Sequence, residues 1–243
     1  MIGNPVRGGG YVLRGLQLLP EKKLRVFVLV PLIINILLFS LALSILINQL
    51  PGWIDDWLSF LPGFLSFLEF VLYPLFALTA VLVVYYSFNI VANILAAPFN
   101  GLLSERVEQL VAGREVADAS VKELLAIIPR SIAREFAKLA YYIPRLLLLF
   151  VLSFIPGINL FAPLFWFLFG AWMMAIQYCD YPMDNNNVSF SAMRSQLKKQ
   201  RFTGLGFGTL VQLGMMIPIL NFIMMPVAVV GATVYWIEEH SES

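Results

Sequence analysis

Long stretches without a charged side chain alternate with shorter charged segments along this sequence. The uncharged windows are residues 26–54, 70–104, 146–179 and 202–237. A helix of about 20 residues crosses the ~30 Å hydrocarbon core of a bilayer, and every window is longer than this. Because a water-soluble protein carries charge on most of its surface helices, the pattern predicts an all-α integral membrane protein.

Two of the windows each predict one long transmembrane helix, over residues 26–47 and 73–95. Between them, residues 48–69 hold three acidic residues and two tryptophans but no Lys or Arg. This mixture is typical of an interfacial cap on the non-cytoplasmic side. Basic residues collect in 1–25 and 105–145. The positive-inside rule places both segments at the cytoplasmic face, the second as amphipathic helices.

The other two windows are interrupted near their middle. The interrupting residues are Pro156 and Asn159 in the first window, and Pro218 and Asn221 in the second. Pro disfavours a helical residue before it, and Asn supports a turn. Residues 146–155 would reach only ~15 Å as a helix, about half a bilayer. We therefore predict re-entrant, half-penetrating helical hairpins over 146–178 and 202–237. Their shared Ile-Pro-x-x-Asn turns indicate either an internal repeat or the common needs of a membrane bend.

Composition narrows the classes of function. With 243 residues and a net charge of +1, the chain lacks the basic surface of a nucleic-acid-binding protein. Its single Cys179 and single His240 provide no ligand cluster for a metal and no convincing nucleophile–base pair. We expect one membrane domain over 1–243 with lipids around it, no metal, no cofactor, no nucleic-acid partner and no enzymatic activity.

Two short segments with glycine are best interpreted as structural. Gly8-Gly9-Gly10 lacks the Lys-Ser/Thr of a phosphate loop and is predicted to be a flexible lead into a helix around residues 11–19. Residues 98–101, Pro-Phe-Asn-Gly, are predicted to end the second transmembrane helix.

Basic residues beside the first transmembrane helix are candidates for anion binding. Lys22, Lys23 and Arg25 precede it directly. The N-terminus of a helix offers free amide donors and a positive dipole end, which suit an oxyanion. The same residues also suit a positive-inside anchor that reaches lipid phosphates. The residues alone leave both interpretations open.

Two further groups carry the same ambiguity. Arg130 and Arg134 lie on one face of a predicted helix, with Lys138 and Arg145 within the same arc. This face is either a surface on lipid headgroups or a basic vestibule that concentrates an anion. The neighbours Glu105 and Arg106 are either an ion pair at headgroup level or part of a gate.

Residues 96–108, which follow an aromatic-rich apolar run, resemble the CysZ family of bacterial inner-membrane sulfate permeases, related to the etoposide-induced membrane proteins. Segments 11–16 and 24–31 and Pro163-Leu164 support the resemblance. It implies an all-helical, multi-pass protein of the inner membrane with two long transmembrane helices, half-penetrating hairpins and a homo-oligomeric state. It also implies sulfate transport, channel-like or proton-coupled, that supplies sulfur for cysteine biosynthesis.

In this family a Gly-Leu-Arg motif before the first transmembrane helix binds sulfate. The resemblance assigns this role here to Lys23, Leu24 and Arg25, with Lys23 in place of the glycine and Val26 where a second Arg often stands. Residues of a possible anion pathway are Lys22, Glu105, Arg106, Arg130 and Arg134. The alternative function is a non-transporting membrane scaffold or assembly factor that binds lipids or partner proteins.

Overall fold

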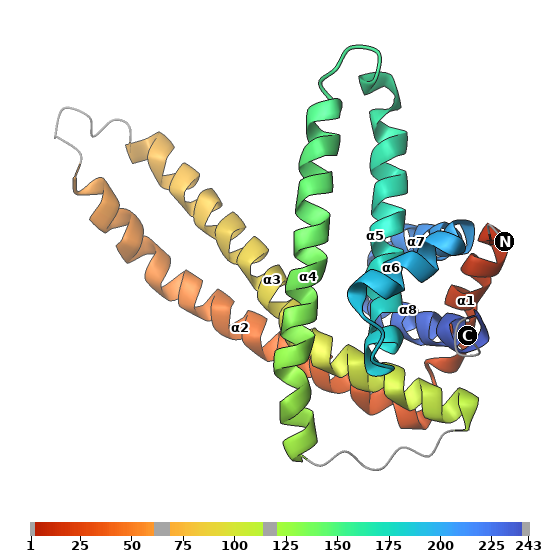
Figure 1. The fold of residues 1–243 in the computed structure, drawn as a ribbon. Coiled ribbons are helices and arrows are strands. Elements are labelled where there is room, and N and C mark those ends of the chain that lie inside the picture. The colour runs from red at the N-terminus through yellow and green to blue at the C-terminus, as the bar shows by residue number, and fades with distance from the viewer. Residues whose placement is uncertain (1–2, 61–68, 114–120, 240–243) are drawn as a thin grey trace. The chain divides into compact units, whose positions relative to one another are not determined.

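The computed structural model describes residues 3–60, 69–113 and 121–239, and these form helices joined by turns, with no strand among them (Figure 1). The helices are α1 (Pro5–Leu18), α2 (Lys22–Leu58), α3 (Glu69–Ala112), α4 (Val121–Leu152), α5 (Ala162–Asn185), α6 (Phe190–Lys199), α7 (Arg201–Met216) and α8 (Pro218–Glu239), with the short 3₁₀ helix η2 (Asn159–Phe161) before α5. The all-α prediction is confirmed. Residues 61–68 of the predicted cap, and His240, lie outside the described residues.

Three helical segments in the described chain are long and apolar enough to cross a bilayer: Lys22–Leu58, Phe70–Ser87 and Asn159–Asn185. The first two overlap the transmembrane helices predicted from the sequence. The third lies in a window for which we predicted a re-entrant hairpin. These segments make the chain a membrane protein.

Two helices continue past the ends that the sequence predicted for them. α2 runs on beyond residue 47 to Leu58, so the described part of the cap extends the same helix. α3 continues through Pro98 to Ala112, and the prediction that residues 98–101 end it is wrong. Helix-breaking residues are tolerated where a neighbouring helix satisfies the polar groups. Here the Asn185 side chain donates to the Gly101 carbonyl at 2.8 Å.

Both predicted turns occur where the sequence placed them. α4 ends at Leu152 and α5 begins at Ala162, while α7 and α8 are separated by the extended residue Ile217. Ile217 precedes a proline, and proline disfavours the helical conformation in its predecessor. The arms of the first hairpin are longer than predicted, however. The leading arm, predicted as residues 146–155, is the end of α4, a helix of 32 residues. The other arm, α5, has 24 residues and spans ~36 Å, so the argument for re-entry from a short arm fails for this hairpin.

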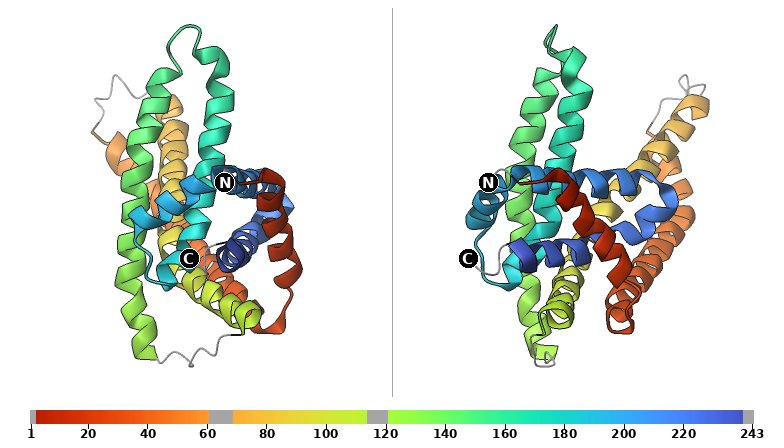
Figure 2. Two further views of the ribbon diagram at one scale, coloured as in Figure 1. Left: turned by 45° about the vertical axis from the view of Figure 1, so that its right-hand side comes forward. Right: turned by 90° about the vertical axis from the view of Figure 1, so that its right-hand side faces the viewer.

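The chain divides into two compact units, residues 1–28 with 97–243, and residues 29–96. In the larger unit α5 packs on α7 and α8, and α1 lies across the same two helices (Figure 2). The largest fully buried side chains of the described residues include Leu24, Leu103, Ile176, Met183, Phe207 and Tyr235. The first turn of α2 and the last turns of α3 therefore contribute to this core.

Polar contacts tie α1 to the end of α8. Arg7 forms an ion pair with Glu239 at 2.9 Å, Arg14 pairs with Glu238, and the Tyr11 hydroxyl donates to Glu239 at 2.9 Å. Burial raises the pKa of Tyr11 well above its usual range, with the hydrogen bond to Glu239 adding to the shift. The hydroxyl therefore remains a donor at physiological pH, and the two ends of the described chain stay joined.

The three glycines near the N-terminus lie inside α1, not in a flexible lead before it, so that prediction is wrong. A Cβ atom on Gly8 would lie 2.0 Å from the Thr203 carbonyl oxygen of α7. Gly8 therefore allows the backbones of α1 and α7 to approach each other. Gly10 has open space around it.

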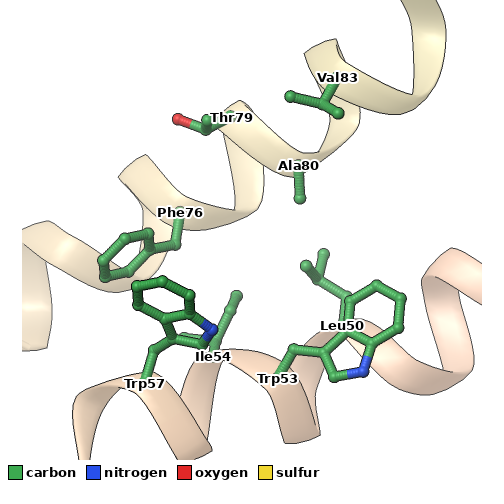
Figure 3. Close-up of a pocket in the computed structure, with 8 residues that line it drawn as sticks. All are labelled: Leu50, Trp53, Ile54, Trp57, Phe76, Thr79, Ala80 and Val83. Atoms are coloured by element: carbon green, nitrogen blue, oxygen red, sulfur yellow. The ribbon is translucent and has the colours of Figure 1, made fainter. Parts of the chain in front are cut away.

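The smaller unit is the antiparallel pair formed by residues 29–58 of α2 and 69–96 of α3. Between them lies a pocket of about 280 Å³, lined by Leu50, Trp53, Ile54, Trp57, Phe76, Thr79, Ala80 and Val83 (Figure 3). Its one hydroxyl, on Thr79, donates to the Leu75 carbonyl at 2.8 Å. The lining carries no cation, and its other polar atoms are the indole nitrogens of Trp53 and Trp57. Such a pocket suits hydrocarbon better than a divalent anion.

Candidate functional site

The first turn of α2 separates one buried side chain from three exposed cations. Leu24 is completely buried in the core of the larger unit, whereas Lys22, Lys23 and Arg25 are exposed. Helical periodicity explains this, because one position in a turn faces the core while its neighbours face away. Leu24 therefore fixes the place of this turn, and the cations around it remain accessible.

Backbone donors are available at the same turn. The first four amides of a helix lack intrahelical acceptors. The Leu24 amide donates to the Glu21 carbonyl at 3.0 Å, but no residue in the described chain accepts from the Lys22 or Lys23 amide. Arg25 Nε donates to the Pro20 carbonyl at 2.9 Å, which folds the guanidinium back over the turn that leads into α2. Free amides and nearby cations are the groups that suit an oxyanion.

The end of α3 lies against this part of α2. Leu103 and Val107 share the core with Leu24, and Arg106 Cζ lies 5.8 Å from the centre of the Phe27 ring. Arg106 also donates to the Gln109 side chain at 2.9 Å. Its neighbour Glu105 is half-buried. Of the predicted pathway residues, Arg106 is thus brought to the second turn of α2.

Arg130 and Arg134 lie elsewhere, on the face of α4 that meets the end of α5. Arg134 Nε is 2.8 Å from Asp180 Oδ1, and Arg130 Nη2 is 3.0 Å from Asp184 Oδ1. Lys138 Nζ is 2.6 Å from Glu135 Oε1 and 3.5 Å from Asp180 Oδ2. We call these six residues the α4–α5 ion-pair network. The positive charges of its three cations equal the negative charges of its three carboxylates.

The prediction of a basic face on α4 did not include its acidic partners on α5. A signal for them was present, because Asp180 and Asp184 are four residues apart, as are Arg130 and Arg134. Two helices with opposite charges at this spacing can pair along one face. Asp180 directly follows the uncharged window 146–179. Its burial, with 1% of the side chain exposed, shows that it faces α4.

A second cavity adjoins the network. It measures about 360 Å³ and is lined by Arg130, Arg134, Asp184, Asn187, Ser189 and Phe190, among others. Arg130 Nη1 also donates to the Asn187 side chain at 3.0 Å. Within residues 3–60, 69–113 and 121–239, no cluster of His, Cys, Asp and Glu could hold a metal ion. The guanidinium, amide and hydroxyl groups in the lining of this cavity are hydrogen-bond donors, which suit an anion or water.

Comparison with known proteins gives one consistent result. A sequence model of the family described as "Sulfate transporter CysZ/Etoposide-induced protein 2.4" matches residues 11–226. A protein of Pseudomonas aeruginosa (strain LESB58) named "Sulfate transporter CysZ" is 47% identical over 236 residues, which cover 97% of this chain and 96% of the relative.

Relatives from other bacteria carry the same name. The protein of Pseudomonas syringae pv. tomato is 48% identical over 233 residues, covering 96% of this chain and 92% of the relative. The protein of Vibrio parahaemolyticus is 46% identical over 240 residues, covering 98% of this chain and 97% of the relative. With this identity over nearly its full length, the chain belongs to the family of sulfate transporter CysZ and etoposide-induced protein 2.4.

Proposed function

We propose that this protein transports sulfate across the bacterial inner membrane and thereby supplies sulfur for cysteine biosynthesis. The observation that carries the proposal is the 46–48% identity, over nearly the whole chain, to relatives that are each named a sulfate transporter. Three helical segments of membrane-spanning length agree with transport. A scaffold or assembly factor is not favoured, because the relatives are named as transporters and not as structural proteins or enzymes.

We propose the first turn of α2 as the sulfate-binding site. A divalent anion loses its hydration shell only where donors and cations replace it. The Lys22 and Lys23 amides, the Lys23 ammonium and the free donors of Arg25 supply this replacement, while Leu24 holds the turn in the core. Because this site is exposed, it can bind sulfate and also release it, as a transport site must.

The pathway beyond this site is proposed to use the polar residues next to it. Lys22 and Arg106 lie on the adjoining turns of α2 and α3, with Glu105 beside them. Arg130 and Arg134 line the 360 Å³ cavity and are already bonded to carboxylates. An anion that reaches this cavity would exchange with those carboxylates, so that each guanidinium stays paired throughout.

We further propose that the whole chain is a single membrane domain that works as a homo-oligomer. In this arrangement α2 and α3 cross the bilayer, and the α4–α5 and α7–α8 hairpins enter and leave by one face. α7 has 16 residues and reaches only ~24 Å, less than the hydrocarbon core. Charged residues flank both hairpins, with Arg145 and Asp180 around the first, and Arg201 and Glu238 around the second. The basic segments 1–25 and 105–145 would face the cytoplasm.

Replacing Arg25 tests the site and the function together. We expect Arg25→Ala to lower the sulfate affinity of reconstituted protein at least about tenfold, or ~1.4 kcal/mol, because the guanidinium donors are removed. Uptake of radiolabelled sulfate into proteoliposomes measures this, with empty vesicles as the blank. Arg201→Ala is the matched control, since Arg201 is an exposed arginine in the first turn of α7.

The outcomes separate the function from its site. Saturable uptake by wild type and by Arg201→Ala, with weakened affinity in Arg25→Ala, supports both. Equal affinity in a folded Arg25→Ala variant removes Arg25 as a ligand but leaves transport in place. Wild-type uptake no greater than that of empty vesicles contradicts sulfate transport itself.

A further inference from the structure

Two arginines from different helices meet on the ring of Tyr141. Arg145 Cζ lies 3.5 Å and Arg194 Cζ 4.8 Å from the ring centre. The two guanidinium groups can therefore be no farther apart than the sum of these distances. Tyr141 and Arg145 belong to α4, and Arg194 belongs to α6. Phe190, also on α6, packs edge-on against Tyr141 at 6.1 Å and lies 4.9 Å from Arg194 Cζ. We call Tyr141, Arg145, Phe190 and Arg194 the Tyr141 cluster.

The charges of this cluster are not neutralised within the described chain. The other basic residues on this face of α4 form the ion-pair network with Glu135, Asp180 and Asp184. Neither Arg145 nor Arg194 forms an ion pair with any residue that the structure describes. The Arg145 side chain donates to the Tyr141 carbonyl at 2.7 Å. Two cations thus share one aromatic ring without a counter-charge.

Besides a counter-charge, Arg194 lacks a hydrogen-bond acceptor for one of its donors. Its Nε atom is inaccessible to water and has no hydrogen-bond acceptor. A buried donor without an acceptor costs about 1–3 kcal/mol. An arginine guanidinium stays charged in proteins, so it cannot escape this cost by losing its proton. Stacking on Tyr141 and Phe190 holds the group in place and leaves its hydrogen-bonding donors unused.

We propose that Arg145 and Arg194 form a binding site for a tetrahedral oxyanion, either free sulfate or the phosphate of a lipid headgroup. Such an anion presents several oxygens and can accept from both guanidinium forks at once. It supplies the missing counter-charge and an acceptor for Arg194. Arg145 is the last charged residue before the uncharged window 146–179, and Arg194 lies eight residues before 202–237. Headgroup phosphate and soluble sulfate are both present at such a position.

The site is independent of the proposed role of the first turn of α2. It rests on Tyr141, Arg145, Phe190 and Arg194, none of which belongs to α2 or α3. An anion bound there bridges α4 to α6, the helix between the two hairpins. Binding therefore also stabilises the packing of α6 on α4.

The test uses Arg145→Gln and Arg194→Gln in full-length protein purified in detergent. Lys199→Gln is the matched control, because it removes an exposed cation from the same helix, α6. One arm measures binding of inorganic sulfate by equilibrium dialysis, in the Arg25→Ala background so that the first turn of α2 contributes less to the signal. The other arm counts bound phosphatidylglycerol by native mass spectrometry. Elution from a size-exclusion column verifies that each variant is folded.

We expect both glutamine variants to weaken binding of one probe at least about tenfold, and the Lys199 variant to change it less than about twofold. Loss in the sulfate arm identifies a free anion as the ligand, and loss in the lipid arm identifies a headgroup. Arg194→Lys, which keeps the charge without the planar fork, should fall between wild type and Arg194→Gln. Binding of both probes unchanged in folded Arg145→Gln and Arg194→Gln proteins would overturn the proposal.

Discussion

Arg134→Ala is expected to lower the free energy of unfolding by about 3–5 kcal/mol, the cost of leaving one member of a buried ion pair without its partner. Asp180 is 1% exposed and Arg134 14% exposed, with 2.8 Å between Nε and Oδ1. Arg134 also donates to the Val188 carbonyl at 2.9 Å, which fixes the chain between α5 and α6. Lys138, 3.5 Å from the other Asp180 oxygen, cannot replace both interactions. Unfolding in mixed micelles of increasing sodium dodecyl sulfate measures the loss.

Arg130→Ala is the matched control for this experiment. Arg130 lies one helical turn away and pairs with Asp184, but 48% of its side chain is exposed. Solvent screens such a pair, so its removal should cost less than about 1 kcal/mol. Adding Asp180→Asn to Arg134→Ala should recover part of the lost stability, because the amide carries no charge to leave unpaired. Equal stability of Arg134→Ala and wild type would show that the Asp180 carboxylate is solvated or neutral.

Several elements of the fold could be predicted because a single local cause determines them. The uncharged windows place the apolar helices, since charge is excluded from hydrocarbon. Pro218 places the break between α7 and α8 at Ile217.

Other elements depend on contacts between distant parts of the chain and could not be predicted. Pro98 is typical of a helix end, yet α3 continues past it to Ala112. Residues of α5 hold the stretch that follows, since Asn185 donates to the Gly101 carbonyl and Tyr181 accepts from the Asn100 side chain. The hairpin predicted over 146–178 ends too early, because α5 extends past the uncharged window to Asn185. The uncharged windows predict which segments lie in the membrane, but they do not predict where the helices end.

In the candidate site, too, the features with a local cause could be predicted, and those that depend on distant residues could not. Exposed cations at the start of α2 follow from their position before an apolar run, and this part was predicted. The complete burial of Leu24 depends on α3, through Leu103 and Val107. The partners of Arg130 and Arg134 are about 50 residues away in the sequence. Only tertiary structure distinguishes these paired arginines from the uncompensated pair on Tyr141.

Gly8→Ala and Gly10→Ala, two residues apart in α1, are expected to change stability in opposite directions. A Cβ on Gly8 would lie 2.0 Å from the Thr203 carbonyl oxygen and 2.7 Å from the Phe207 amide nitrogen. Both atoms belong to the backbone of α7, which cannot rotate away as a side chain can. α1 must therefore move off α7, which should cost about 3 kcal/mol, the upper end of the range for overpacked sites.

At Gly10 the same methyl group meets nothing within 4 Å. Alanine restricts the unfolded chain and favours a helix, so Gly10→Ala should raise stability by about 0.5–1 kcal/mol. The two variants have identical composition, and any difference between them reports the contact of α1 with α7. Thermal unfolding in detergent, followed by circular dichroism, measures both. Equal unfolding temperatures for the two variants would mean that α1 does not pack on α7 through Gly8, and the ion pairs of Arg7 and Arg14 with α8 would then have to hold α1 in place.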